Sequence, residues 1–266
     1  DWSSDVCSSD LLAQNAQRLV EAPMFVIQIS VDGPDEQTHN ASRPGANPSV
    51  NNFQVISKAI DKILEIRKEK GQRLPLIATL TTINNVNYKK LVDIYEVFRN
   101  KADVCVFYLA WWIDEASAKN HARDFERRFG FKPQKHYGWI GNWLPPDISA
   151  LSDQLKRLNK FASDMSGPAV IIMPPLVEPS ELHRYYTDHD CTFGFDKCVS
   201  IFSAVEINSN GDMSPCRDYH DFVVGNIKDK TITELWNSDL YKKFRKSISE
   251  KGLMPVCTRC CGLMGY

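Results

Sequence analysis

The sequence lacks a strong excess of charge, a long apolar segment and any internal repeat. Its 266 residues carry 32 Lys and Arg against 33 Asp and Glu, so the net charge of −1 gives no general attraction to nucleic acid or anionic lipid. No apolar run reaches the roughly 18 residues that a membrane helix needs. The start of the chain has neither the basic residues nor the apolar stretch of a secretory signal. We therefore expect a cytoplasmic protein without nucleic-acid or membrane partners.

The histidines also show no paired spacing, which argues against a histidine metal site. Cysteine is the residue type that stands out, with eight in the chain and six of them between Cys191 and Cys261. A disulfide framework is typical of short secreted chains, whereas clustered cysteines in a longer intracellular protein indicate a metal site. Cys105 stands apart in an apolar run that resembles a strand.

Residues 1–11 have no apolar periodicity and resemble the translation of a common sequencing adapter. We expect them to be an artefactual leader, which removes Cys7 from the set of candidate ligands. On this expectation the natural protein extends further upstream.

The middle of the chain alternates between strand and helix patterns. Apolar runs at 24–30, 74–83 and 103–109 predict strands, and helical spacing follows each of them, at 49–70, 88–99 and 114–129. This alternation predicts about three βα units of a parallel sheet, too few for an eight-stranded barrel of ~250 residues. We expect residues 131–148 to be a linker or loop, 149–165 a helix, and 166–190 irregular or extended because of their prolines.

The composition changes at Cys191. An alternating run at 202–208 predicts a strand, and Asn210-Gly211 is a hairpin turn signal that leads to a return strand ending near Cys216. Thr231 and Glu234 have the spacing of a capping box, which predicts a helix start. A last helix is expected over 239–250.

Four cysteines form the candidate metal site: Cys198, Cys216, and the C-x-x-C pair Cys257 and Cys260. Four thiolates suit either a [4Fe–4S] cluster or a structural zinc ion, and the spacing alone leaves both open. Cys191 and Cys261 are alternates. Cys260 is favoured over Cys261 because it completes the C-x-x-C. The zinc alternative would make the chain a four-cysteine binding module without redox activity.

The cysteines lie among further motifs in a fixed order over residues 191–266. The motifs are Cys198, Gly211-x-x-x-x-Cys216, Val224-Gly-Asn-Ile227, Glu234-Leu-Trp-Asn-Ser238 and Cys257-x-x-Cys260. With these motifs the region resembles the SPASM/twitch C-terminal domain of radical SAM enzymes, in its shorter form with one auxiliary cluster. The resemblance implies a [4Fe–4S] cluster on Cys198, Cys216, Cys257 and Cys260, with an electron-relay or structural role.

The upstream run Ile29-Ser-Val-Asp-Gly-Pro34, followed by His39 and Arg43, is similar to the fourth strand and following loop of the radical SAM barrel. The resemblance implies the C-terminal half of a partial (β/α)6 barrel. It also implies that Ser30 and Arg43 help to hold S-adenosylmethionine. The forked guanidinium of Arg43 suits the carboxylate of that cofactor, because it can bind a carboxylate bidentately. Asn84 or Asn85 is a further cofactor contact, with Asn85 preferred, and Asp32 at the strand end is a candidate catalytic residue.

The 266 residues contain neither the C-x-x-x-C-x-x-C motif that binds the catalytic cluster of this family nor a Gly-Gly-Glu stretch. We therefore expect the C-terminal fragment of a radical SAM/SPASM enzyme, inactive by itself. The full-length protein would use a second [4Fe–4S] cluster, an electron donor such as flavodoxin or ferredoxin, and a peptide or small-molecule substrate. The predicted division is a leader at 1–11, a partial barrel at 12–130, a linker with a helix at 131–190 and an auxiliary-cluster domain at 191–266.

Overall fold

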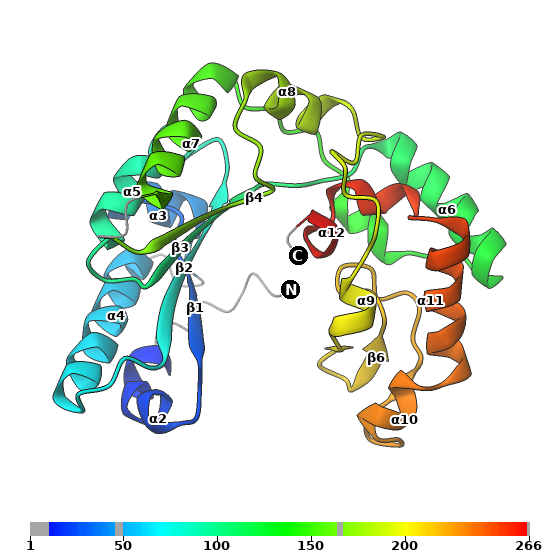
Figure 1. Ribbon diagram of the computed structural model, residues 1–266, viewed down its shortest axis with the longest axis horizontal. Helices are drawn as coiled ribbons and strands as arrows, with labels where there is room; N and C mark the ends of the chain where they lie inside the picture. Colours follow the sequence, from blue (N-terminus) through cyan, green and yellow to red (C-terminus); the bar gives the residue numbers. More distant parts are fainter. Residues whose placement is uncertain (1–10, 46–49, 164–166, 265–266) are drawn as a thin grey trace. The chain divides into compact units, whose positions relative to one another are not determined.

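The computed structural model describes residues 11–45, 50–163 and 167–264 (Figure 1). The expectations for residues 1–10, Cys7 among them, lie outside the described residues. The chain divides into two compact units. One contains the described residues up to Ala110 together with Pro145–Leu182, and the other contains Trp111–Leu144 together with the described residues from His183 onward.

The first unit is built on a four-stranded parallel sheet in the order β1-β2-β3-β4. Its strands pair in register, with Ser30 opposite Leu80 and Tyr108 opposite Met173. Because parallel strands end at one edge, Ser30 and the residues after it lie beside the end of β2. This confirms the expected α/β class and the parallel strand–helix units. The strands are β1 (Val26–Ser30), β2 (Leu76–Ile83), β3 (Val104–Leu109) and β4 (Ala169–Met173).

Helices cover one side of this sheet (Figure 1). Their apolar residues recur at helical spacing, as in α4, where Ile56, Ile60 and Ile63 are buried. The other face of the sheet is less covered, since Gln28, Thr82 and Ile171 are exposed. The helices of this unit are α2 (Ala16–Glu21), α3 (Glu36–Ser42), α4 (Asn52–Glu69), α5 (Leu91–Phe98) and α7 (Ile148–Ala162).

The structure agrees in part with the expectation of an irregular or extended segment over residues 166–190. Residues 169–173 are extended, but they form β4, which pairs with β3 in the sheet and is not part of a linker. Residues 179–187 then form α8 (Pro179–Thr187). Prolines flank both elements without interrupting them, because proline is tolerated outside a strand and at the first turn of a helix.

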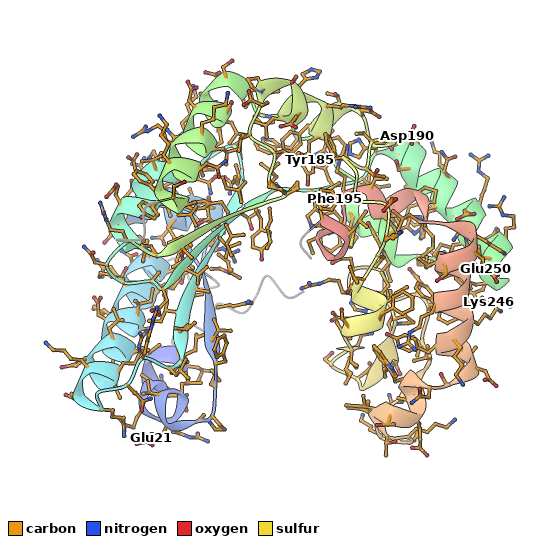
Figure 2. All side chains as sticks on the ribbon, in the orientation of Figure 1. Glu21, Tyr185, Asp190, Phe195, Lys246 and Glu250 are labelled. Carbon is orange, nitrogen blue, oxygen red and sulfur yellow. The ribbon has the colours of Figure 1, made fainter. Side chains whose placement is uncertain are left out.

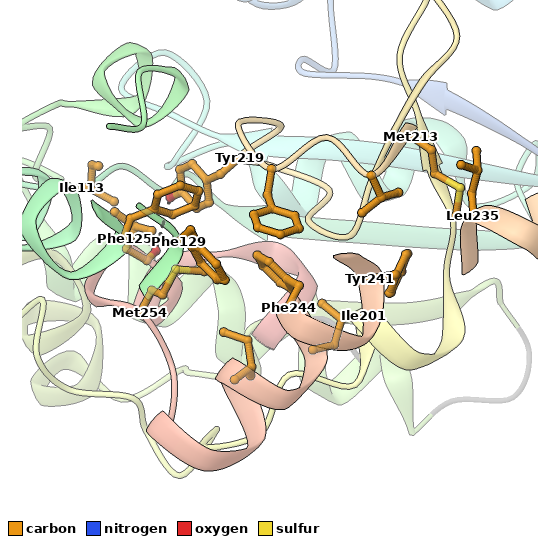
Figure 3. Packing of buried hydrophobic residues seen from close by; sticks show 14 of the residues in the cluster. Ile113, Phe125, Phe129, Ile201, Met213, Tyr219, Leu235, Tyr241, Phe244 and Met254 are labelled. Carbon is orange, nitrogen blue, oxygen red and sulfur yellow. Dashed lines mark hydrogen bonds between the residues drawn. The ribbon is translucent and has the colours of Figure 1, made fainter. Parts of the chain in front are cut away.

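The second unit contains a long helix, α6 (Glu115–Phe129), and a three-stranded antiparallel sheet in the order β5-β6-β7. Its apolar core joins Phe129 of α6 to Phe222 and Phe244, whose rings lie 4.6 and 5.4 Å from that of Phe129 (Figure 3). The other elements are η2 (Lys135–Trp139), α9 (Ser200–Ser203), β5 (Glu206–Ile207), β6 (Asp212–Ser214), β7 (Gly225–Asn226), α10 (Ile232–Trp236), α11 (Asp239–Lys251), η3 (Pro255–Arg259) and α12 (Cys261–Met264).

Helix α6 belongs to the C-terminal unit, although the sequence places it in the partial barrel that ends at 130. Its buried residues Ala118, Phe125 and Phe129 are part of the apolar core of that unit. Periodicity identifies the apolar face of a helix but not the partner that covers it, so this assignment required the structure. Among the described helices, none has the length and apolar character needed to cross a membrane.

Candidate functional site

The hairpin and the helices around it place the four predicted cysteines at loop positions of the C-terminal unit. Cys198 precedes α9, Cys216 follows β6, Cys257 lies in η3 and Cys260 directly follows η3. Cys260 is buried, and the other three are partly buried. Cys198, Cys216 and Cys257 pack against the apolar core of the unit.

Each of the four thiols is linked electrostatically to at least one other member of the set. Burial is the main cause that raises the pKa of Cys257 to about 12, and the charge on Cys198 adds to it. Burial also raises the pKa of Cys216, with a contribution from Cys257, and that of Cys260, with contributions from Cys216 and Cys257. The structure thus brings the predicted set together.

The residue types of this set suit either of two metal centres. A structural zinc requires four ligands at about 2.0–2.3 Å from one centre. A [4Fe–4S] cluster takes four thiolates, one on each iron. In the described part of the chain, no three His, Cys, Asp or Glu side chains are grouped closely enough to hold one metal ion.

Backbone amides are directed at the sulfur atoms. The Gly262 N–H donates to Cys260 Sγ at 3.2 Å. Burial is the main cause that raises the pKa of each of the other three thiols, and hydrogen bonds from backbone amides lower it. These amides belong to Ser200 and Ile201 at Cys198, to Asp218 and Tyr219 at Cys216, and to Met254 at Cys257. Hydrogen bonds of this kind stabilise thiolates and tune the potentials of iron–sulfur clusters. The donor set therefore fits an iron–sulfur cluster.

Asp218 is a member of this site that the sequence analysis missed. Its carboxylate accepts a hydrogen bond from Cys260 Sγ at 2.7 Å and lies 3.8 Å from Cys261 Sγ. Asp218 is two residues from Cys216 in the same loop, and this proximity in sequence is the one signal that could have indicated it.

The alternate cysteines lie differently. Cys261 begins α12 and shares Asp218 with Cys260, and its pKa is raised to about 11, mainly by burial. Cys191 contributes its backbone carbonyl to Arg259. Cys105 is buried in β3, where burial raises its pKa to about 11.

The two residues inside the C-x-x-C anchor the loop. Thr258 Oγ1 donates to the His189 carbonyl at 2.6 Å, and Arg259 donates to carbonyl oxygens of the segment 185–191. The side chains of Tyr185 and Asp190 in that segment are labelled in Figure 2. Thr258 and Arg259 lie between Cys257 and Cys260 in sequence. Their hydrogen bonds therefore hold the backbone that carries the two cysteines.

The other motif residues position Cys216. Gly211, with φ of +93°, makes the turn between β5 and β6, and its N–H donates to the Asn208 carbonyl. Asn226 donates to the Asp212 carboxylate at 3.0 Å, which ties β7 to the hairpin. The predicted capping box of Thr231 is present at the start of α10. These residues therefore fix the hairpin that leads to Cys216 and the start of the helix after β7.

The first unit gathers the other predicted residues at the ends of β1 and β2. Asp32 is buried, and its carboxylate accepts from Arg43 Nε at 2.5 Å and from the Thr82 N–H at 2.7 Å. Burial raises the pKa of Asp32, while Arg43 and the Thr82 amide oppose the shift. Gly33 is required here because a Cβ atom would lie 2.3 Å from the His39 nitrogen. His39 accepts the Asp32 N–H at Nδ1.

The remaining predicted contacts, Ser30 and Asn85, lie at the end of β1 and just after the end of β2. Ser30 ends β1 and is partly buried, and Asn85 is exposed. The neighbours of Asn85 donate hydrogen bonds to backbone carbonyls. Asn87 Nδ2 donates to the carbonyls of Asp32 and Thr82, and Asn84 Nδ2 donates to the carbonyl of Thr82. Asn85 is thus the more accessible of the two candidates, Asn84 and Asn85.

Residues 198–261 match the model of the SPASM family, described as an iron–sulfur cluster-binding domain. Among solved structures, the chain is similar to native anSMEcpe with bound AdoMet and Cp18Cys peptide, at 18% identity and a TM-score of 0.50. It is also similar to histidine-tagged anSMEcpe with bound AdoMet, at 19% identity and the same TM-score. In both cases the alignment covers 97% of this chain and 61% of the other. A comparison with curated protein sequences found no match. The family model confirms the expected SPASM domain, and the structural likeness confirms the expected fold.

Proposed function

We propose, on the premise that this chain carries a SPASM domain on the radical SAM fold of anSMEcpe, that it is the C-terminal portion of a radical SAM/SPASM enzyme. The whole enzyme would cleave S-adenosylmethionine reductively and modify a substrate. The observation that carries this proposal is the match of residues 198–261 to a cluster-binding domain whose cysteine loops come together in the structure.

Cys198, Cys216, Cys257 and Cys260 would hold one auxiliary [4Fe–4S] cluster. When bound, such a cluster supplies one-electron chemistry or rigidity to the domain. The chain contributes backbone amides beside each of the four sulfurs, and it fixes the C-x-x-C through Thr258 and Arg259. The match of residues 198–261 to an iron–sulfur cluster-binding domain supports this cluster over a single zinc ion.

In the first unit, Ser30, Arg43 and Asn85 would contact S-adenosylmethionine. The Arg43 side chain is 37% exposed, so part of it stays accessible to a ligand carboxylate while Asp32 fixes its Nε. We assign Asp32 a positioning role, because its buried carboxylate is already used by Arg43 and Thr82.

The likeness to a structure with a bound peptide favours a peptide over a small-molecule substrate. An electron donor such as flavodoxin or ferredoxin would supply the reducing electron. The 266 residues contain no C-x-x-x-C-x-x-C, so the chain would form no 5′-deoxyadenosyl radical on its own.

Anaerobic reconstitution with iron and sulfide tests the cluster. The expected result is a brown protein that retains iron and sulfide after desalting and absorbs in the visible region. A colourless protein that retains zinc instead would support the four-cysteine binding module. Retention of neither metal contradicts both. Release of 5′-deoxyadenosine by the reconstituted chain with dithionite and S-adenosylmethionine would contradict the proposed inactivity.

A further inference from the structure

Arg245 of α11 is a partly buried arginine at the centre of an aromatic cluster in the second unit. Its guanidinium carbon lies 3.9 Å from the ring centres of both Trp236 and Tyr241, and 5.8 Å from that of Phe202. Arginine stacks favourably on aromatic faces, so these rings hold the guanidinium in place. Trp236 is the tryptophan of the Glu234-Leu-Trp-Asn-Ser238 motif, and Arg245 is its partner in the fold.

The guanidinium donates hydrogen bonds to two backbone carbonyls. Nε donates to the Ile201 carbonyl of α9 at 3.0 Å, and Nη1 donates to the Trp236 carbonyl at the end of α10 at 3.1 Å. Arg245 therefore joins α11, which carries it, to both shorter helices. The planar fork of arginine suits this task, because it presents several donors in fixed directions.

The α9 turn depends on contacts of this kind. It has four residues, and so short a helix is not stable by itself. Backbone hydrogen bonds from Phe202 and Ala204 close residues 199–204 into one turn. The buried side chain of Ile201 packs in the core of the unit (Figure 3), and Tyr241 Oη donates to the Ala204 carbonyl at 3.5 Å. Two side chains of α11 thus hold this turn at two of its carbonyls.

The α9 turn lies beside two of the proposed cluster ligands. Cys198 is two residues before Ser200, the first residue of α9. Ser200 also lies near the C-x-x-C loop, because a Cβ atom on Gly262 would stand 3.3 Å from Cys260 Sγ and 3.6 Å from Ser200 Cβ. A shift of the turn would therefore move Cys198 relative to Cys260.

We propose that Arg245 is a positioning residue for the auxiliary cluster: by fixing the Ile201 carbonyl, it holds Cys198 in place for the other three thiols. A [4Fe–4S] cluster takes one thiolate on each iron, so the fourth ligand must be held together with the other three. The link to the cluster rests on the proposed function, whereas the hold on Cys198 is a property of the chain itself. The two parts are therefore tested separately.

The first measurement compares the reduced full chain with R245Q, R245K and the control K246Q. Iodoacetamide labelling of Cys198 and Cys257 is followed with time by peptide mass spectrometry. R245Q should speed the labelling of Cys198 roughly fivefold, in the range that loss of one hydrogen bond produces in a local opening equilibrium, and should leave Cys257 unchanged. R245K keeps the charge over the rings, so its effect should be smaller. K246Q changes a side chain that is 73% exposed and should match the wild type.

A second control separates the positioning of one cysteine from a general loss of stability. F129L loosens the same core, since the Phe129 ring packs on those of Phe222 and Phe244. It should speed the labelling of Cys198 and Cys257 together. The second measurement follows the release of iron from the reconstituted proteins to a chelator. R245Q should release iron faster than F129L when the two are compared at equal free energy of unfolding.

The outcomes separate this inference from the proposed function. A wild-type chain that retains no iron refutes the proposed function, and the labelling still tests the hold of Arg245 on Cys198. R245Q labelling that is unchanged at Cys198, or that is raised equally at Cys198 and Cys257, overturns the positioning role. Iron release from R245Q at the wild-type rate, despite faster labelling, overturns the link to the cluster. If R245Q does not fold, R245K carries the test: selective labelling of Cys198 supports the inference, and wild-type or uniform labelling overturns it.

Discussion

Arg43 Nε lies 2.5 Å from the carboxylate of Asp32, a side chain that is almost fully buried at the end of β1. The same carboxylate accepts from the Thr82 N–H, so it ties the end of β1 to β2 while holding Arg43. Replacing Asp32 by Asn keeps the shape but removes the charge and one acceptor oxygen. We expect D32N to lower the free energy of unfolding by about 1–3 kcal/mol, the usual cost of a buried group left unsatisfied.

Urea unfolding followed by circular dichroism checks this prediction. Asp61 provides a matched control, because its ion pair with Lys101 lies at the surface, with the Asp61 side chain 55% exposed. D61N should change the stability by less than about 1 kcal/mol. Equal effects of D32N and D61N would show that the buried ion pair has no special importance for the first unit.

His39 makes the first unit sensitive to acid. Burial is the main cause that lowers its pKa from 6.5 to about 4, and Arg43 adds to the effect. Its Nδ1 accepts the Asp32 N–H, which requires the neutral ring. The unfolded chain then binds more protons than the folded one below about pH 6.5, so stability is complete above that pH and falls as the pH drops from about 6.5 to about 4. The loss can reach about 3 kcal/mol at about 1.36 kcal/mol per pH unit.

The pH dependence is tested by measuring the free energy of unfolding between about pH 7.5 and pH 4, which brackets the titration of this ring. H39Q should flatten the profile over the acid part of that range, since the titrating group is gone. H183Q is the control, because His183 is exposed and lies outside the buried core. A profile of H39Q that keeps the wild-type slope would assign the acid sensitivity to other groups, such as buried His121.

The elements that the sequence predicted well are those with long, regular patterns. The strands β1 to β3 and the helices α4, α5, α6 and α7 formed where periodicity placed them, and the Asn210-Gly211 turn and the Thr231 capping box were also confirmed. β4 could not be predicted in the same way, because five apolar residues between prolines carry no period long enough to distinguish a strand from a loop. The short helix α3 was missed for a similar reason.

The candidate site was predictable to a different extent. The spacing of the cysteines identified the candidate thiols, because metal ligands come from a few residue types that can be recognised in a sequence. Asp218 and Arg259 are ordinary charged residues in sequence. The contact of Asp218 with the Cys260 sulfur and the burial of Arg259 both depend on tertiary packing. The predicted roles of Ser30, Arg43 and Asn85 toward S-adenosylmethionine stay predictions.

Gly225 is the position where the SPASM motif most clearly requires glycine. Its φ is +147°, and a Cβ atom would lie 2.5 Å from a methyl carbon of Leu235, a fully buried side chain. We expect G225A to lower the free energy of unfolding by about 1–3 kcal/mol through backbone strain and overpacking. Gly194, with φ of +86° and open space around it, is the matched control. G194A should cost less in the same thermal or urea unfolding assay, and an equal loss would mean that the Leu235 contact relaxes without cost.

The cysteine assignment predicts two classes of serine variants. C198S, C216S, C257S and C260S each remove a proposed ligand and should reduce the iron and sulfide that the reconstituted chain retains. C105S should retain the wild-type amounts, since Cys105 lies in β3 of the other unit. C191S and C261S test the alternates directly. Full iron in C260S together with loss of iron in C261S would transfer the fourth position to Cys261.

Thr258 offers a test of how the C-x-x-C loop is held. Its hydroxyl donates to the His189 carbonyl at 2.6 Å, and both residues are buried. T258V keeps the volume of the side chain but leaves that carbonyl without this donor, which should cost about 1–3 kcal/mol. T258S keeps the hydroxyl and loses only a methyl group, so it should behave closer to the wild type. Because the loop carries Cys257 and Cys260, we expect the reconstituted T258V protein to lose iron faster to a chelator than T258S. Equal rates of iron loss in the two variants would show that the His189 hydrogen bond does not hold the ligand loop.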